Sequence, residues 1–309
     1  MSASFASALG AARDAAAAQH YPQGALYVVA TPIGNLADIT LRALHLLQLA
    51  DAVACEDTRH TQSLLRAYGI DKSGAQLLAA HQHNEAEAAE AVLARLRDGQ
   101  RVACVSDAGT PAVSDPGARL VAAARAAGMP VVPLPGASSV TAALSAAGIP
   151  MAPAGGATGF VFAGFLPSKS AERDAAVQAL GAQPRAAVLL EAPHRIEPLS
   201  RALGALGARP VTLAREITKQ FEQIATLPAQ ELAAWLAADP NRARGEFVLV
   251  VHPPAPADGD GAGDAEALRV LRLLLAELPV KSAVKLAAEI TGAPRNALYA
   301  RALELRGGD

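Results

Sequence analysis

Short apolar runs alternate with amphipathic or alanine-rich stretches along residues 24–148. The runs are bounded by Gly, Pro or charged residues, which is typical of buried strands, whereas the stretches between them have the length and spacing of helices. Strands that alternate with helices indicate a parallel α/β sheet. The predicted strands are residues 25–30, 52–55, 76–80, 102–105 and 131–134.

A second set of apolar runs follows the glycine-rich segment 154–159, and its members are residues 160–164, 187–190, 211–214, 221–226 and 247–251. No long helical stretch precedes the run 221–226, so this second sheet is predicted to be mixed. We therefore predict two α/β domains, residues 25–153 and 154–252, with a ligand cleft between them.

Both ends of the chain differ from these domains. Residues 1–24 are alanine-rich, with a single Arg13 and no basic stretch before an apolar core, so we expect a flexible extension and no signal peptide. Residues 253–264 are rich in Pro, Ala, Gly and Asp and are predicted to form a linker. Beyond the linker, the module 265–309 resembles a helix-turn-helix, because a short Gly-containing turn precedes a helix that begins with Pro. Its predicted helices are residues 264–277, 280–290 and 294–306.

Composition narrows the class of protein. Hydrophobic residues make up 51% of the 309 residues and aromatic residues 4%, and prolines and glycines interrupt the uncharged segment 126–166. We therefore predict a globular protein without a transmembrane segment. The net charge of −2 excludes a generally basic nucleic-acid binder, so any RNA contact must be local. Cys55 and Cys104 fall in predicted buried strands, as free cysteines of cytosolic proteins do, which indicates the cytoplasm.

Three loops rich in Gly and Pro follow predicted strands of the first domain, at residues 31–35, 106–117 and 133–139. Loops at the carboxyl ends of parallel strands share one edge of the sheet, where ligands bind. In the second loop, glycine lets the backbone approach a small molecule, and Asp107 and Thr110 supply directional hydrogen bonds. None of the loops has the spacing of a P-loop or of a dinucleotide-binding glycine motif, so a nucleotide-like ligand would be bound in another way.

The sequence also predicts how the helix after the loop 106–117 begins. Ser114 or Asp115 is placed to cap it, because short polar side chains accept the unpaired N–H groups of a first helical turn.

Polar clusters after other predicted strands are less decisive. Residues 56–60 would form either a strand-end salt bridge with a helix cap or a substrate contact, and the sequence favours neither. His81 and His83 are spaced to share a strand face, but no third ligand has suitable spacing, so we predict no metal site. The segment 185–220 holds six Lys or Arg against three Glu, which favours a strip that faces phosphates. The small basic excess of the helical tail fits an exposed helix face equally well.

With these motifs in view, the chain resembles the small-subunit ribosomal RNA methyltransferases of the tetrapyrrole methylase superfamily. The resemblance covers residues 26–305 and is carried by residues 29–40, 55–59, 106–117, 133–139, 191–195 and 215–222. It implies two α/β domains of the tetrapyrrole methylase type with a cleft between them, S-adenosylmethionine as methyl donor, and a homodimer. The implied acceptor is the ribose 2′-hydroxyl of a decoding-region cytidine in the 16S rRNA of the 30S subunit.

The resemblance also implies roles for individual residues, with the donor held mainly by main-chain groups of both domains. The implied donor contacts are Thr31, Pro32, Asp107, Ala108, Gly109, Pro111, Ser138 and Ser139 in the first domain, and Ala192, Ala214 and Gly245 in the second. A hydroxyl is a poor nucleophile, so a positioned base would add roughly 10²-fold or more. The candidate bases are Glu191, His194, Lys219 and Glu222. The residues expected to hold the RNA backbone are Arg59, Arg195 and Lys219.

Two other functions stay open at this point. Methylation of a tetrapyrrole carbon is the alternative within the superfamily, and the helical tail disfavours it. A helix-turn-helix regulator with a small-molecule sensing domain would bind duplex DNA, but its candidate recognition helix holds few basic residues.

Overall fold

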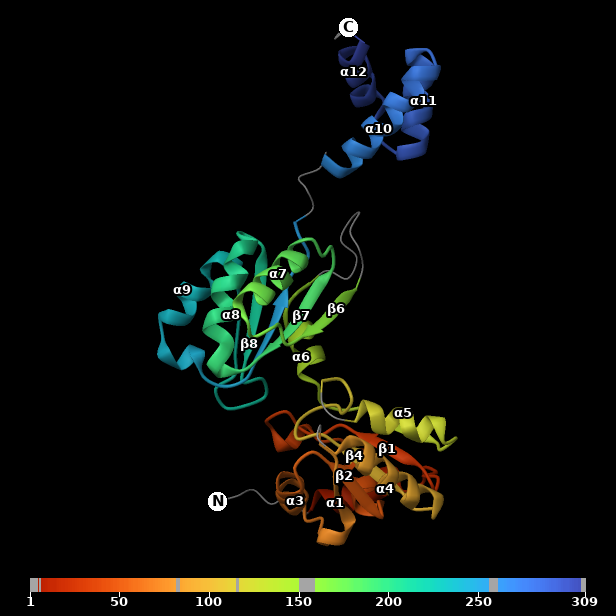
Figure 1. Cartoon of the computed structure of the whole chain (residues 1–309), viewed down its shortest axis with the longest axis vertical. Helices are drawn as coiled ribbons and strands as arrows, with labels where there is room; N and C mark the ends of the chain where they lie inside the picture. Colours follow the sequence, from red (N-terminus) through yellow and green to blue (C-terminus); the bar gives the residue numbers. More distant parts are fainter. Residues whose placement is uncertain are drawn as a thin grey trace.

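The computed structural model describes residues 5, 7–81, 84–114, 117–149, 159–255 and 261–306. Figure 1 shows a first sheet domain (red to yellow), a second (green to cyan) and a helical module (blue), which follow one another along the long axis. This arrangement confirms the predicted architecture. Most of the predicted joint 154–159, and residues 256–260 of the predicted linker, lie outside the described residues.

Every strand pair in the first sheet is parallel, as predicted. The order is β3-β2-β4-β1-β5, and the strands are β1 (Leu26–Val29), β2 (Ala52–Cys55), β3 (Leu77–Ala79), β4 (Val102–Val105) and β5 (Val131–Leu134). All residues of β2 and β4 are buried, because helices cover both faces of the sheet. One face packs against α2 (Leu41–Leu49) and α3 (Thr58–Ala67), and the other against α4 (Glu85–Arg97) and α5 (Ala118–Ala126).

The first helix corrects one prediction. We expected residues 1–24 to be a flexible extension, but α1 (Ala8–Ala16) packs against α2, and Ala12 and Tyr21 belong to the core of the first domain. Alanine has the highest helix propensity, and its small side chain allows close helix packing. In the described part of this segment, the expectation of flexibility is therefore wrong for residues 8–16.

The second sheet is mixed, as predicted, and its strand order is β6-β7-β10-β8-β9. The strands are β6 (Phe160–Gly164), β7 (Ala186–Glu191), β8 (Pro210–Arg215), β9 (Gln223–Pro228) and β10 (Phe247–Val251). Neighbours β6 and β7 are parallel, and the other three pairs are antiparallel. One face packs against α7 (Ser170–Gly181), α8 (Ile196–Leu203) and α9 (Leu232–Ala237).

The opposite face of the second sheet packs against α6 (Ser139–Ala146), which follows the last strand of the first domain. Val140 and Ala143 of α6 belong to one apolar cluster with Val188 of β7 and Val248 of β10. Because α6 begins directly after the loop that leaves β5, this cluster holds the carboxyl edge of the first sheet against the second domain.

Helices α10 (Gly261–Glu277), α11 (Val280–Thr291) and α12 (Arg295–Arg306) form the terminal module around a core of their own, which includes Leu271 and Leu298. Gly292 ends α11 in the left-handed conformation, with a φ of 73°, in the turn that the sequence predicted. Within the described ranges, no helix is both long and apolar enough to cross a membrane.

Candidate active site

The carboxyl edge of the first sheet faces one edge of the second sheet. At that second edge, Glu191 at the end of β7 and Arg215 at the end of β8 both pair with Phe247 at the start of β10. A cavity lies between the two edges, and residues of both domains line it. The cleft that the sequence predicted between the domains is therefore present.

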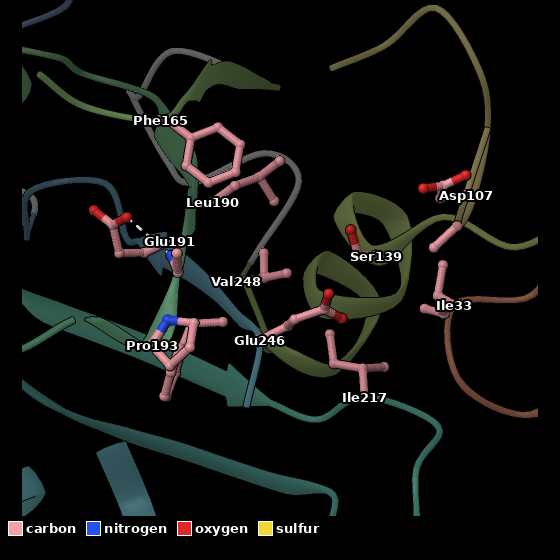
Figure 2. A pocket seen from close by; sticks show the side chains of 13 residues that line it. Ile33, Asp107, Ser139, Phe165, Leu190, Glu191, Pro193, Ile217, Glu246 and Val248 are labelled. Atoms are coloured by element: carbon pink, nitrogen blue, oxygen red, sulfur yellow. Dashed lines mark hydrogen bonds between the residues drawn. The ribbon is translucent and has the colours of Figure 1, made fainter. Parts of the chain in front are cut away.

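The main chamber of this cleft has a volume of about 360 Å³. Figure 2 shows Phe165, Leu190 and Val248 of the second domain on one side, and Ile33 and Asp107 of the first domain on the other. The volume lies in the range of small-molecule sites.

Two further spaces join the main chamber. A small extension of about 130 Å³ runs along the loop after β4 and the start of α6. A lateral chamber of about 400 Å³ opens beside α3. Ala108 lines all three spaces, so they lie next to one another.

Hydrogen bonds join the three Gly- and Pro-rich loops into one wall. Thr31 and Gly109 each donate a backbone N–H to the carbonyl oxygen of the other, at 2.9 and 3.0 Å. The Thr31 hydroxyl donates to the Ser106 carbonyl oxygen at 3.1 Å, and the Thr110 hydroxyl donates to the Ala137 carbonyl oxygen at 3.1 Å. Thr31, predicted as a donor contact, is buried and holds the neighbouring loop.

Two glycines let these loops approach each other closely. Gly109 has a φ of +83°, and a Cβ atom there would lie 3.2 Å from Cγ2 of Ile33. A Cβ atom on Gly136 would lie 2.8 Å from Cβ of Ala30, closer than side-chain carbons pack. The packing of the loops therefore requires glycine, in agreement with the predicted close backbone approach.

The predicted cap of the next helix falls partly outside the described residues. Helix α5 follows Gly117, which has a φ of 138° and no side chain with which to cap the helix. Ser114 instead lines the small extension of the cleft. Asp115 and Pro116 lie outside the described residues.

Asp107 lines the cleft and contacts the loop after β2. The Asp57 N–H donates to Oδ1 of Asp107 at 3.3 Å, and Nε2 of His60 lies 3.1 Å from the Asp107 carbonyl oxygen. Asp57 also caps α3: its Oδ1 accepts the N–H groups of Arg59 at 2.8 Å and His60 at 3.3 Å, and these bonds lower the pKa of its carboxyl group. The segment 56–60 is therefore a helix cap that also contacts Asp107.

The loop after β8 borders the cleft from the second domain. Glu216 and Thr218 have φ angles of 51° and 68°, which residues other than glycine rarely adopt. The Thr218 hydroxyl accepts the Asn35 N–H at 3.1 Å, so this loop is joined to the first domain. A Cβ atom on Gly34 would lie 2.4 Å from Cγ of Lys219. The two domains thus meet closely at this loop, and Gly34 is required there.

Lys219 joins two carboxylates in this loop region. Its Nζ lies 2.9 Å from Oε1 of Glu216 and 3.0 Å from Oε2 of Glu246, and Oε1 of Glu216 also accepts the Glu246 N–H at 2.9 Å. Burial lowers the pKa of the Lys219 ammonium, but its hydrogen bonds to the two carboxylates outweigh burial and raise it. Burial raises the pKa of Glu216, and the hydrogen bonds from Lys219 and the Glu246 N–H lower it overall. Lys219 is therefore a fixed cation, and a protonated amine does not fit the expected role of base.

Glu191, another expected base, is buried at the end of β7. Its Oε1 accepts the Ala192 N–H at 2.9 Å and lies 3.0 Å from Nε of Arg195. Arg195 also donates to the Leu166 carbonyl oxygen. Figure 2 shows the Glu191 carboxylate turned away from Asp107 across the chamber. This ion pair connects the segment after β6 to the end of β7. Glu191 lines the main chamber, but its carboxylate is buried in the pair.

The basic strip expected along residues 185–220 is largely used within the chain. Arg209 donates to four backbone carbonyl oxygens, and Arg215 donates to two. Arg195 and Lys219 are held in ion pairs. Most of these cations therefore stabilise the second domain. Arg59, at the start of α3, lies 3.5 Å from the Asp57 carboxylate and still has 92% of its side chain exposed.

The chain matches known protein families over most of its length. Residues 25–233 match the family model described as Tetrapyrrole (Corrin/Porphyrin) Methylases. The chain belongs to the tetrapyrrole methylase family. Residues 261–306 match a second model, described as the RsmI C-terminal HTH domain. The expected family membership is confirmed.

Among the tetrapyrrole methylases, the chain is similar over most of its length to proteins named Ribosomal RNA small subunit methyltransferase I. The protein from Escherichia coli O157:H7 is 50% identical over 92% of this chain and 96% of its own length. The protein from Pseudomonas aeruginosa is 49% identical over 92% of this chain and 98% of its own.

Two solved structures support the same fold. A cobalt precorrin-4 methyltransferase has a TM-score of 0.55 at 21% identity, and the match covers 75% of this chain and 98% of that one. A uroporphyrin-III-C-methyltransferase from Thermus thermophilus has a TM-score of 0.52 at 25% identity, and the match covers 74% and 94%.

Most of the expected donor contacts line the methylase cleft, and these are Pro32, Asp107, Ala108, Gly109, Ser138, Ser139 and Ala192. Pro111 and Ala214 are buried outside the lining of the described chambers, and Gly245 directly precedes the lining residue Glu246. Of the expected bases, His194 and Glu222 are exposed and do not line those chambers either. The Glu222 carboxylate accepts the Thr218 N–H at 2.7 Å.

The remaining expectation concerns metals. His83 lies outside the described residues, so its pairing with His81 has no structural counterpart. In the described part of the chain, no group of three or more His, Cys, Asp or Glu side chains is placed to hold a metal ion.

The structure adds lining residues that the sequence did not single out: Phe165, Leu190, Ile217, Glu246 and Val248. Two of them carried a local signal. Phe165 directly follows Gly164 at the end of β6, and Glu246 lies between Gly245 and the start of β10. Both glycines have positive φ angles, +63° and +88°, so the backbone turns sharply at the edge that faces the cleft.

Proposed function

We propose that this chain transfers a methyl group from S-adenosylmethionine to the ribose 2′-hydroxyl of a decoding-region cytidine, cytidine 1402, in the 16S rRNA of the 30S subunit. The observation that carries the proposal is the similarity, at 50% and 49% identity over 92% of the chain, to proteins named Ribosomal RNA small subunit methyltransferase I. The match of residues 261–306 to the RsmI C-terminal domain supports the same branch of the family.

The lining of the main chamber fits the proposed donor. Phe165, Leu190 and Val248 supply an apolar wall suited to an adenosine. Asp107 faces this wall from the first domain, and the negative charge of its carboxylate favours a cationic ligand. When bound, the donor supplies an activated methyl group on a positively charged sulfur.

The groups of the chain itself would mainly hold and align the two substrates. Ala108, Gly109 and Ser139 line the cleft where the donor would bind. Arg59, with its exposed side chain, is available to the RNA backbone, and Lys219 would contribute its positive charge from within its ion pairs. A cleft between two domains also limits the access of water, and alignment in such a site accounts for a large part of a transfer rate.

The relationship to this family also favours a homodimer in the cytoplasm. Light scattering on the purified protein should give twice the chain mass of 31.4 kDa. A monomer at micromolar concentration would contradict the dimer without affecting the proposed reaction.

The reaction is tested by incubating the protein with labelled S-adenosylmethionine and 30S subunits that lack the modification, followed by nucleoside mass spectrometry. We expect 2′-O-methylcytidine from 16S rRNA. If no methylated cytidine forms, the proposed function is wrong. A parallel incubation with porphyrinoid substrates tests the alternative within the family, and a methylated porphyrinoid would replace the proposal.

A variant pair tests the donor site. Asp107→Asn keeps the shape of the side chain and removes its charge, and we expect the dissociation constant of S-adenosylmethionine to rise about tenfold in calorimetry. The matched control is Asp174→Asn, at an exposed carboxylate on α7 that accepts the Ser170 hydroxyl at 3.3 Å. Equal affinity for both variants would remove Asp107 from the donor site.

A further inference from the structure

The lateral chamber differs in character from the main chamber. Its lining comes mostly from the first domain, where the loop after β1 supplies Pro32 and Leu36 and helix α3 supplies His60, Ser63 and Leu64. Three charged residues, Asp107, Lys219 and Glu246, also line it, so it combines apolar surfaces with polar and charged side chains. Its volume of about 400 Å³ is in the range of small-molecule sites, so the cleft has room for two ligands side by side.

The two chambers meet at a defined place. Four residues line both of them, namely Ile33, Asp107, Ala108 and Glu246. Two of the four carry carboxylates, one from each domain. A group passed from a ligand in one chamber to a ligand in the other must cross this junction, so the charged side chains here would be nearest to the reacting atoms.

Glu246 is the junction residue with the best-defined setting. Figure 2 shows its side chain reaching from the start of β10 toward the side where Ile33 and Asp107 lie. The ammonium group of Lys219 holds its Oε2 at 3.0 Å, while 74% of the side chain remains exposed. The carboxylate is thus fixed in direction and still accessible to a ligand and to water.

Resting on the function proposed above, we propose that the lateral chamber receives the acceptor nucleotide and that the Glu246 carboxylate removes the proton from its hydroxyl group. In this step the bond from the ribose oxygen to the methyl carbon forms while the carbon–sulfur bond breaks. The electron pair of the broken bond stays on sulfur, which becomes neutral. The hydroxyl proton passes to Glu246 and then to solvent, through the exposed side of the carboxylate.

The other charged groups nearby are less suited to this role. Lys219 is a protonated cation in its ion pairs, and the Glu191 carboxylate is turned away from the chamber. Oδ1 of Asp107 already accepts the Asp57 N–H, and Asp107 belongs to the loop wall assigned to the donor. Glu246 remains the carboxylate that the second domain presents at the junction.

The start of α3 supports the placement of a nucleotide. Arg59 precedes the lining residue His60, and its exposed guanidinium lies on the element that borders the lateral chamber. Leu36 and Leu64 would contact a flat base, and His60 and Ser63 offer hydrogen-bonding groups to its edge. The chamber thus combines the contacts that a single nucleotide needs.

The role of Glu246 is tested by Glu246→Gln, with Glu197→Gln as the control. Glu197 is an exposed carboxylate on α8 that lies 3.8 Å from Arg201. In single-turnover methyl transfer to 30S subunits, we expect Glu246→Gln to be about 10²-fold slower than the wild type, with an unchanged dissociation constant for S-adenosylmethionine in calorimetry. The control should match the wild type in both measurements. The role of Glu246 would be overturned if Glu246→Gln transferred the methyl group as fast as the wild type. It would also be overturned if the variant's loss in donor affinity were as large as its loss in transfer rate.

The lateral chamber is tested by filling it. Ser63→Trp places a large side chain in the chamber from an exposed helix position, and its control is Ser145→Trp, an exposed serine of α6 with the same local hydroxyl-to-carbonyl bond. We expect Ser63→Trp to weaken the binding of a labelled decoding-region RNA at least tenfold in fluorescence anisotropy, with donor affinity preserved. RNA binding equal to that of the control would refute the acceptor site.

The two levels of the proposal fail in different ways. If the wild type forms no methylated cytidine, the proposed function is wrong and the acceptor role falls with it. If the wild type is active and both Glu246→Gln and Ser63→Trp behave like their controls, the proposed function stands and the further inference alone is wrong.

Discussion

Replacing Gly245 by alanine tests how the acidic side of the cleft is held. Gly245 has a φ of +88°, and a Cβ atom there would lie 2.4 Å from Cγ and 2.5 Å from Cδ of Glu216. Glu216 would have to move. Its Oε1 accepts the Glu246 N–H and contacts Lys219, each at 2.9 Å, so both interactions would be lost.

The expected magnitude has two parts. A Cβ atom in left-handed backbone costs about 1–2 kcal/mol. The lost hydrogen bonds involve a charged carboxylate with a side chain 21% exposed, and a hydrogen bond to a charged group contributes about 1.5–3 kcal/mol. From these two parts we expect Gly245→Ala to lower the free energy of unfolding by about 2.5–5 kcal/mol. In a Glu216→Ala background no Cγ remains to clash, so only the backbone cost of about 1–2 kcal/mol should appear.

Urea unfolding followed by tryptophan fluorescence measures both costs. Trp235 is the only tryptophan of the chain and lies on α9, with the Arg242 guanidinium 4.3 Å from its ring centre, so the signal reports the second domain. The wild type, Gly245→Ala, Glu216→Ala and the double variant form a double-mutant cycle. We expect the coupling free energy between the two positions to be about 2 kcal/mol. If Gly245→Ala has the same cost with and without the Glu216 side chain, the glycine does not serve to accommodate Glu216, and this argument is refuted.

Three further predictions concern other parts of the structure. Arg195→Met leaves Glu191 buried without its guanidinium partner, so we expect the free energy of unfolding in urea to fall by about 3 kcal/mol. Adding Glu191→Gln should recover most of this loss, and no recovery would contradict the pairing. The pKa of Asp57 is lowered in the folded state, so the ionised Asp57 stabilises the protein at neutral pH, and this stabilisation is lost as the pH falls below the ordinary value of 3.8. The unfolding midpoints of the wild type and Asp57→Ala should therefore converge at low pH, and a constant gap between them would contradict this. Burial raises the pKa of Cys55, and it raises that of Cys104 to about 12. A thiol reagent at about pH 8 should therefore label both cysteines only after unfolding, and rapid labelling of the native protein would contradict this.

The sequence by itself determined the fold and the edge at which the site lies. Strand patterns such as 52–55 and 102–105 are continuous apolar runs, because both faces of a parallel sheet are covered by helices. Loops that leave parallel strands must share one edge, so the motifs 31–35, 106–117 and 133–139 could be placed together without coordinates, and the structure joins them by hydrogen bonds.

Only the tertiary structure decided what individual charged and alanine residues do. Local sequence does not specify which partner a charge will meet. Arg195 and Glu191 pair with each other, while Glu246 lies at the junction of two chambers and contacts Lys219. The alanines of α1 likewise become a packed helix because α2 offers them a surface. Periodicity and turn residues act locally and can be read along the chain, whereas the pairing and direction of side chains depend on contacts between residues far apart in it.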